Sequence, residues 1–355
     1  MFPERIGKGA ARSTSPSLLL CSSRSAFSSL SSPEPMPTGP TLLDSWSRRG
    51  RLPLNGPLER TSVDRATLSF LTGLLGLAAA FILFQFLLTP IVLVVQIAMA
   101  EGGLSMDAFR NSEQLLATYT RELVVSNSIG QVLGLAVPAL LAARLHSSDW
   151  TEYLRLRGVD GRLLLLALVG VVGLQPVTQW LAEINRQIPL PETVRLMEQS
   201  QLELIRSVLE SNLGLAFNIT MLALVPGVCE EVLFRGYAQR QFERAAGPAA
   251  GILLAGGLFG IYHLRPSQVL PLMVLGVYMA YLVWRTGSLL PAMAVHIAHN
   301  GLAVVGAWYA QTHPSYDLQA IEHAAMPWYA VFGGFVIVGG VLYVMHPLAP
   351  SIRDG

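Results

Sequence analysis

Charged residues are scarce in this sequence of 355 residues: 13% are Asp, Glu, Lys or Arg, whereas 52% are hydrophobic. Soluble domains carry roughly 25% charged residues, so this chain has about half the charge needed to cover a surface that faces water. There are only two cysteines, Cys21 and Cys229, which excludes a disulfide scaffold and a multi-cysteine metal cluster. The net charge of +1 provides no general attraction to nucleic acid, and no nucleic-acid partner is expected.

The sequence contains long runs without any charged residue. Eight runs lack Asp, Glu, Lys and Arg, and each is close to or longer than the about 20 residues that a membrane-spanning helix requires. The runs are 66–100, 123–143, 163–182, 211–229, 245–264, 266–284, 286–316 and 323–352. Backbone groups must pair internally in lipid, and no alternating strand pattern occurs. The sequence therefore predicts an all-α fold, a polytopic membrane bundle of about eight transmembrane helices.

Residues 1–60 differ from the rest in composition. They hold eight basic residues, and ten serines lie among residues 13–32. A segment so poor in apolar surface cannot bury enough of it to fold. We expect a disordered or processed N-terminal tail over 1–60 and an integral membrane domain over 61–355. A transit peptide and a true start at Met36 are the alternatives, so whether residues 1–35 belong to the mature protein stays open.

The segments outside the uncharged runs carry weaker signals. Arginines are concentrated before the first run and in the loop 144–162, and acids balance or outnumber them in the loops 101–122 and 183–210. By the positive-inside rule both termini are expected on the cytoplasmic side. Apolar residues recur at helical spacing over 189–212, which fits an amphipathic helix at the membrane interface or an ordinary loop helix.

Ionisable side chains at membrane depth are candidates for function, because each costs at least about 2.5–3.5 kcal/mol there. The first cluster is Glu230-Glu231-Val-Leu-Phe-Arg235. Glu231 and Arg235 lie four residues apart on one helix face and can pair. Successive residues point about 100° apart, so Glu230 projects elsewhere and can face a cavity. The alternative is that this cluster is only the charged end of a helix.

Histidines supply the other two clusters, Phe259-Gly-Ile-Tyr-His263 and His296-Ile-Ala-His299-Asn300. Each histidine alone is more simply explained as a structural hydrogen-bonding residue. His296 and Asn300 share a helix face. Three clusters in three apolar segments favour a common site.

The position of a predicted turn brings the first two clusters together. No strong helix breaker follows Glu231 before Gly247-Pro248, so the fourth helix can continue to about Glu243. At about 1.5 Å per residue, Glu230 and His263 then lie at similar depth on the two arms of a helical hairpin. We expect the two side chains to meet, because a buried carboxylate requires a partner.

The three clusters resemble the motifs of the CAAX prenyl protease and bacteriocin-processing (CPBP, or Abi) family of intramembrane proteases. That family has E-E-x-x-x-R, F-x-x-x-H and H-x-x-x-N on successive membrane helices. The motifs read here Glu230-Glu231…Arg235, Phe259…His263 and His296…Asn300. The resemblance covers about residues 211–305, the expected catalytic core.

The resemblance implies a role for each motif residue. Glu230 and His263 would activate a water molecule as general base. His296 and Asn300 would stabilise the oxyanion of a tetrahedral intermediate.

The remaining motif residues would support that site. Glu231 would hold its geometry, Arg235 would balance the charge of Glu231, and Phe259 would pack against them.

The resemblance leaves the metal question open. Glu230, His263 and His296 are a donor set that can bind Zn²⁺ with water as fourth ligand, and the family is often described as metalloproteases. Activation of water by Glu230 and His263 without metal is the alternative. The soluble-protease signature H-E-x-x-H does not occur in the sequence.

The resemblance also implies the function and the partners. It implies a CAAX-type endopeptidase that cleaves a peptide bond of a membrane-associated, prenylated protein or peptide, in contact with membrane lipids. Many members look bacterial, so a bacterial plasma membrane is the expected location. The alternative function is a non-catalytic membrane scaffold, immunity or transport protein on the same fold.

Overall fold

A computed structural model of the chain describes residues 54–60, 63–103, 109, 112–211, 213–313, 315 and 325–348. The chain divides into two units, Met1–Arg48 and Arg49–Gly355, and every described residue lies in the second. The structure is 86% helical, and no strand occurs in its described part. An all-α membrane bundle is therefore confirmed. The predicted tail from 1 to 53 lies outside the described residues.

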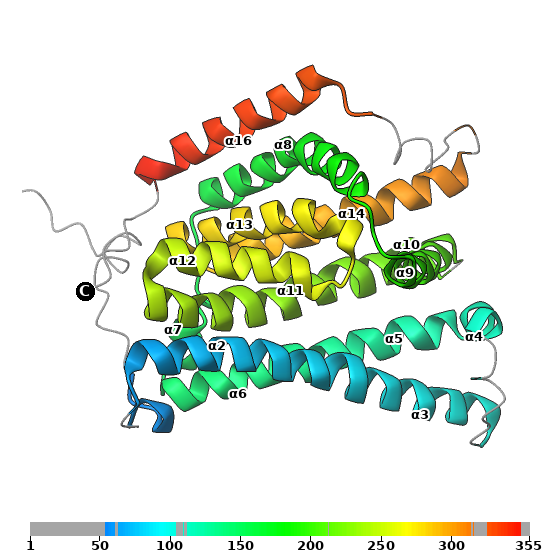
Figure 1. The fold of residues 1–355 in the computed structure, drawn as a ribbon, viewed down its shortest axis with the longest axis horizontal. Coiled ribbons are helices and arrows are strands. Elements are labelled where there is room, and N and C mark those ends of the chain that lie inside the picture. Colours follow the sequence, from blue (N-terminus) through cyan, green and yellow to red (C-terminus); the bar gives the residue numbers. More distant parts are fainter. Residues whose placement is uncertain are drawn as a thin grey trace, which may run out of the picture. The chain divides into compact units, whose positions relative to one another are not determined.

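Figure 1 shows the order of the helices along the described residues. Several contain a π-helical stretch, in which each amide bonds to the carbonyl five residues back. The helices are α2 (Arg65–Phe81), η2 (π, Ile82–Leu88), α3 (Thr89–Glu101), α4 (Ser112–Thr118), α5 (Thr120–Gln131), η4 (π, Val132–Ala136), α6 (Val137–His146), α7 (Trp150–Tyr153), α8 (Gly161–Arg186), α9 (Glu192–Glu210), α10 (Leu215–Ile219), η5 (π, Thr220–Leu224), α11 (Val225–Glu231), η6 (π, Val232–Ala238), α12 (Gln239–Tyr262), η7 (3-10, Pro266–Gln268), α13 (Val269–Thr286), α14 (Leu290–Thr312) and α16 (Trp328–Leu348).

Seven helical stretches in the described part of the chain are long and apolar enough to cross a membrane. The longest, Leu215–Tyr262, spans 48 residues and contains both the fourth and the fifth predicted segments. Gly247 interrupts it with φ +84° and ψ 170°, which is not helical, and Pro248 follows. The chain reverses there, so α11 and the second half of α12 run as two arms of a hairpin (Figure 1). The eight predicted segments thus appear in seven helical stretches, one of which folds back on itself.

The arrangement around this hairpin positions the site. The second arm of α12 packs against α13 on one side and α2 on the other, and α14 packs against α11. Two glycines allow α12 and α13 to approach closely: a Cβ on Gly276 would lie 2.7 Å from the carbonyl oxygen of Gly256. In Figure 1 the long helix from α2 to α3 lies beside the one from α5 to α6, and α16 lies over α8.

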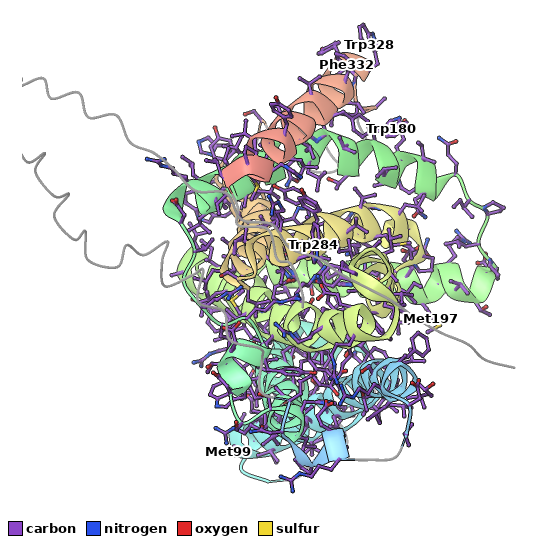
Figure 2. The ribbon with its side chains drawn as sticks, turned by 90° about the vertical axis from the view of Figure 1, so that its left-hand side faces the viewer. Met99, Trp180, Met197, Trp284, Trp328 and Phe332 are labelled. Carbon is purple, nitrogen blue, oxygen red and sulfur yellow. The ribbon has the colours of Figure 1, made fainter. Side chains whose placement is uncertain are left out.

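The outward faces carry large apolar side chains, as expected for surfaces in contact with lipid. Met99 is 77% exposed and Phe332 is 63% exposed. Trp328 and Phe332 project outward from α16 (Figure 2). Trp328 lies at the first residue of α16 and Tyr343 near its end, the positions at which aromatic rings meet the two membrane interfaces.

Residues 54–60, assigned from composition to the tail, are folded. Pro57–Arg60 form a 3-10 helix, η1, which packs against α6. Glu59 accepts two hydrogen bonds of 2.8 Å from Arg244 and lies 2.7 Å from Nδ1 of His146. Gln241 completes the cluster through a 2.6 Å contact with the same imidazole. The cluster joins η1, α6 and α12, so the membrane unit begins before residue 61.

Candidate active site

Glu230 and Glu231 are the last two residues of α11, immediately before the π-helical stretch η6. Wider helical turns of this kind occur often at functional sites, because the extra residue changes the direction of the side chains. Glu230 is 8% exposed, and Glu231 and Arg235 are completely buried. The two carboxylates approach opposite nitrogens of His296, and each has a second neighbour of its own: Arg235 for Glu231 and His263 for Glu230.

The carboxylate of Glu231 accepts hydrogen bonds from side chains on two helices. Its Oε1 accepts from Nη1 of Arg235 at 2.7 Å, which confirms the predicted pairing, and lies 2.8 Å from Nδ1 of His296. Nη2 of Arg235 donates to the backbone carbonyl of Gly276 at 3.1 Å. The pair therefore connects η6 to α13 and α14, so it fixes how three helices meet.

Glu230 faces both motif histidines. Its Oε2 lies 3.8 Å from Nε2 of His263 and 4.0 Å from Nε2 of His296. This oxygen is buried and has no hydrogen-bond partner among the described residues. Polar groups separated by this distance are commonly bridged by water. The predicted approach of Glu230 to His263 across the hairpin is confirmed, because the reversal at Gly247 brings the two side chains together.

The hydrogen bonds at Nδ1 define the protonation of both rings. Nδ1 of His263 donates to the backbone carbonyl of Phe259 at 2.8 Å, since a carbonyl can only accept. Nδ1 of His296 donates to the carboxylate of Glu231 in the same way. In each neutral ring Nε2 then carries the lone pair, and both lone pairs belong to the nitrogens that face Glu230.

Phe259 packs at the centre of these side chains. Its ring meets His263 edge to face at a centroid distance of 4.7 Å and His296 at 5.5 Å. The guanidinium of Arg235 lies 4.3 Å from the centroid of the same ring. Phe259 is completely buried, so it keeps the two imidazoles and the cation at fixed positions without contributing a polar atom.

Asn300 and a further histidine complete the polar side chains of α14. Nδ2 of Asn300 donates to the backbone carbonyl of Leu222 at 3.2 Å, which uses one of its two amide hydrogens. His299 points to α8, where its Nδ1 lies 3.1 Å from Nε2 of Gln175. Within the described structure the Asn300 side chain bonds to η5 and not to Glu230, and its catalytic role stays a prediction.

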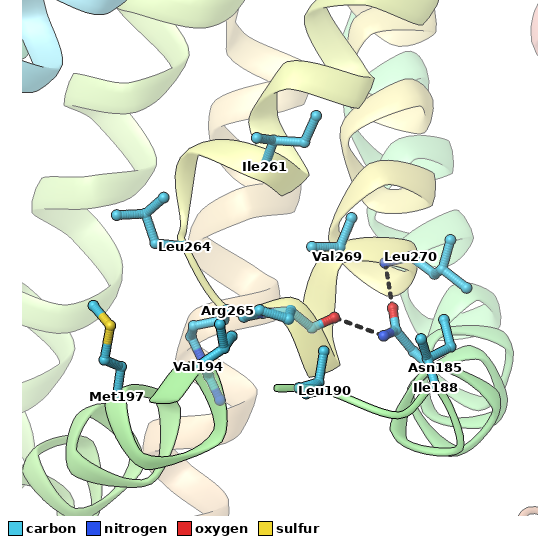
Figure 3. A pocket seen from close by; sticks show the side chains of 11 residues that line it. Asn185, Ile188, Leu190, Val194, Met197, Ile261, Leu264, Arg265, Val269 and Leu270 are labelled. Atoms are coloured by element: carbon cyan, nitrogen blue, oxygen red, sulfur yellow. Dashed lines mark hydrogen bonds between the residues drawn. The ribbon is translucent and has the colours of Figure 1, made fainter. Parts of the chain in front are cut away.

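The turn after α12 carries His263 and is held by residues that motif reasoning missed. Oδ1 of Asn185 accepts from the amide of Leu270 at 2.8 Å, and its Nδ2 donates to the carbonyl of Pro266 at 2.6 Å (Figure 3). Glu198 of α9 accepts from the amide of Ser267 at 2.9 Å and from its hydroxyl at 2.5 Å. α8 and α9 thus fix the turn beside the site, and only the polarity of Asn185 and Glu198 near apolar segments hinted at this.

A cavity of about 520 Å³ lies between the end of α8, α9 and this turn (Figure 3). Its lining is aliphatic except for Asn185 and Arg265. Ile261 and Leu264, on either side of His263, both contribute to the wall. The cavity therefore begins within one residue of a predicted catalytic group.

The donor set predicted for Zn²⁺ stays a prediction. The unpartnered carboxylate oxygen of Glu230 and the two Nε2 atoms are suitable in kind, and their rings carry the Nδ1 hydrogen bonds typical of metal ligands. However, no three His, Cys, Asp or Glu side chains in the described residues are arranged so that they could hold one. We therefore derive no step through zinc.

The motif segment matches a known family. Residues 212–302 match the sequence model of the family described as type II CAAX prenyl endopeptidase Rce1-like. The match includes every motif residue from Glu230 to Asn300 and confirms the family prediction for this part of the chain. No curated protein and no solved structure matches the chain. The seven apolar helical stretches of the described residues indicate an integral, multi-pass membrane protein.

Proposed function

We propose that this protein is an intramembrane endopeptidase that hydrolyses a peptide bond of a prenylated, membrane-associated peptide or protein. The observation that supports it best is the approach of Glu230 Oε2 to Nε2 of His263 and Nε2 of His296. A buried carboxylate oxygen without a partner is costly, and such groups persist where a substrate or water is bound. The family match over 212–302 supports the same reaction class and substrate.

In the proposed mechanism one water molecule binds between Glu230 and His263. Glu230 takes a proton from this water molecule, and the water oxygen attacks the carbonyl carbon of the scissile bond. The lone pair of His263 Nε2 accepts the second water hydrogen and so orients the nucleophile. The tetrahedral intermediate then collapses, and the proton held by Glu230 passes to the leaving amine nitrogen.

The oxyanion is stabilised from α14 in this proposal. His296 donates through Nε2 only when its ring is protonated, because Nδ1 already donates to Glu231. The second amide hydrogen of Asn300 provides the other donor. Losing one such donor typically lowers the rate by about 10²–10³.

Cleavage of a prenylated fluorogenic peptide by the purified protein in liposomes tests the proposal. We expect Glu230→Gln and His263→Ala to abolish detectable turnover, and His296→Ala to lower kcat by about 10²–10³. Glu192→Gln, on the exposed face of α9, is the matched control and should cleave at the wild-type rate. Full activity in Glu230→Gln would overturn the mechanism, and a phenotype in cells that survives this substitution would favour a non-catalytic role.

We also propose that both ends of the membrane unit face the cytoplasm. Eight passes, counted with the hairpin at Gly247, return the chain to the side from which it started. Single cysteines at positions 103 and 148, labelled in intact cells with a membrane-impermeant maleimide, test this orientation. Labelling at 103 and protection at 148 are expected, and the reverse pattern would contradict it.

A further inference from the structure

Tyr262 directly precedes His263 and has no role in the proposed mechanism. Its hydroxyl oxygen is buried and has no hydrogen-bond partner among the described residues. A buried tyrosine hydroxyl usually has a partner, because an unpaired one loses its hydration without compensation. Oε2 of Glu230, on the other arm of the hairpin, is likewise buried and unpaired. The two arms therefore contribute a hydroxyl that can donate and a carboxylate that can only accept.

Aromatic packing fixes the Tyr262 ring beside the helix face that carries Glu230. The ring meets Phe234 edge to face at a centroid distance of 5.0 Å. Phe234 follows Glu230 by four residues, so the two side chains leave the helix on similar sides. The Tyr262 ring also meets Phe81 of α2 at 4.9 Å. Because two aromatic neighbours hold the ring, the position of its hydroxyl is fixed as well.

A small cavity of about 210 Å³ between α2 and the end of α12 is lined by Tyr262 and otherwise by apolar side chains. These are Leu74, Leu77, Ala78, Phe81, Leu258, Ile261 and Leu264. No side chain in this wall can form a hydrogen bond with the hydroxyl. The charge of the Glu230 carboxylate, by contrast, acts on it. The hydroxyl therefore has its polar neighbour on the side of Glu230 and not on the side of α2.

We propose that Tyr262 is a positioning residue for Glu230: its hydroxyl donates to a water molecule that in turn donates to the Glu230 carboxylate. Polar groups too far apart for a direct hydrogen bond are commonly joined in this way, and such a bridge is nearly as favourable as a direct bond. The bridge holds the carboxylate in the orientation in which it takes a proton from the nucleophilic water. This inference rests on the proposed function and deepens it, because it adds a residue on which the general base depends.

Tyr262→Phe removes the hydroxyl and leaves the packing of the ring in place. In liposomes this variant should cleave a prenylated fluorogenic peptide with a kcat about tenfold lower and a nearly unchanged KM, because the base is less well oriented and the contacts to the substrate remain. Tyr278→Phe is the matched control: the Tyr278 hydroxyl is also buried, but it donates to the carbonyl of Ala167 on α8 at 3.0 Å. This control should retain the wild-type kcat. A wild-type kcat in Tyr262→Phe would overturn the positioning role.

A double-mutant cycle on stability tests the bridge without any cleavage. Tyr262→Phe is introduced into the wild-type protein and into Glu230→Leu, which removes the acceptor at similar volume, and the unfolding temperatures are measured in detergent. Groups joined by a shared water give shifts that do not add, whereas independent groups give shifts that do. We expect the Tyr262→Phe shift to differ between the two backgrounds by about 2 °C or more. The Tyr278→Phe shift should be the same in both.

The two measurements separate this inference from the proposed function. Shifts that do not add, in a protein that cleaves no prenylated peptide, would support the bridge between Tyr262 and Glu230 and overturn the peptidase. Normal cleavage by the wild-type protein together with equal Tyr262→Phe shifts in both backgrounds would support the peptidase and overturn the bridge.

Discussion

Glu231 Oε1 accepts hydrogen bonds from both Arg235 Nη1 at 2.7 Å and His296 Nδ1 at 2.8 Å. One oxygen atom thus sets the position of a cation on η6 and the tautomer of an imidazole on α14. Within the described part of the chain, the Glu231 carboxylate forms no hydrogen bond or ion pair with Glu230 or His263. We infer that Glu231 acts through His296, as a positioning residue, and that Glu230 is the group that meets the substrate.

Glu231→Gln should therefore destabilise the fold and impair the site together. Removing one charge of a buried pair leaves Arg235 without its counter-charge, which typically costs about 3–5 kcal/mol. We expect a lower unfolding temperature in detergent and a lower kcat with KM nearly unchanged, because an amide can donate as well as accept and no longer fixes the Nδ1 proton of His296. Arg195→Gln breaks an exposed pair and should change stability by less than about 1 kcal/mol. A variant with wild-type stability and kcat would contradict the role of Glu231.

Close packing of α12 against α13 is the basis of a second prediction. A Cβ on Gly276 would meet backbone atoms of Gly256 at 2.7 and 2.9 Å, and backbone cannot move aside as a side chain can. Gly276→Ala should destabilise the protein by about 1–3 kcal/mol and lower activity, because the Gly276 carbonyl accepts from Arg235. Thermal unfolding and peptide cleavage measure the two effects.

Gly306→Ala on α14 is the matched control. No atom lies within 4 Å of the Cβ it would add, and alanine favours a helix over glycine by about 1 kcal/mol. We expect this variant to be as stable as wild type or more so. Equal stability of the two variants would show that α12 and α13 are less closely packed than described.

The sequence predicts the helical class and the Glu230–His263 contact because both depend on local features. Uncharged length identifies the spans, and Gly247-Pro248 marks the reversal that sets two residues at equal depth. The number of separate helical stretches is harder to predict from sequence, because the reversal at Gly247 lies within one continuous apolar region. Apolar length alone cannot distinguish one helix from two.

Contacts between distant segments could not be predicted. Glu231 and His296 are 65 residues apart, and Asn185 reaches Pro266 across 81 residues. Which polar side chains meet at such distances depends on how the helices rotate and cross, and apolar periodicity does not determine it. The folded segment 54–60 was missed for a related reason: Glu59 is an ordinary charged residue until Arg244 and His146 are brought to it.

The cluster at Glu59 predicts a pH dependence of stability. Burial alone would raise the pKa of this carboxyl, but the hydrogen bond to His146 and the charge of Arg244 outweigh burial and hold the pKa below its ordinary value of 4.5. The unfolded chain then binds a proton more readily than the folded one, so stability falls as pH drops from 4.5 through the lowered pKa. The contribution is fully present above pH 4.5.

Unfolding of the detergent-solubilised protein across pH 3 to 7 checks this dependence. Glu59→Gln should unfold at a lower temperature at pH 7 and lose part of the decline in acid. Glu192→Gln should retain the decline, because that carboxylate is on an exposed helix face. An identical decline in wild type and Glu59→Gln would rule out the cluster as its cause.

The arrangement of Glu230, His263 and His296 leads to a prediction on metal dependence. Zn²⁺ requires oxygen and nitrogen ligands at about 2.0–2.2 Å, so its ligands approach one another closely. The separations of 3.8 and 4.0 Å between Glu230 Oε2 and the two Nε2 atoms are wider than the roughly 3.3–3.6 Å between tetrahedral zinc ligands, and the mechanism proposed above uses no metal. We expect protein purified without added metal to cleave its peptide at the same rate before and after prolonged dialysis against a chelator. Elemental analysis of the same samples should give well under one zinc per chain. Stoichiometric zinc that is removed together with activity, and that restores activity on return, would instead assign the three side chains as ligands.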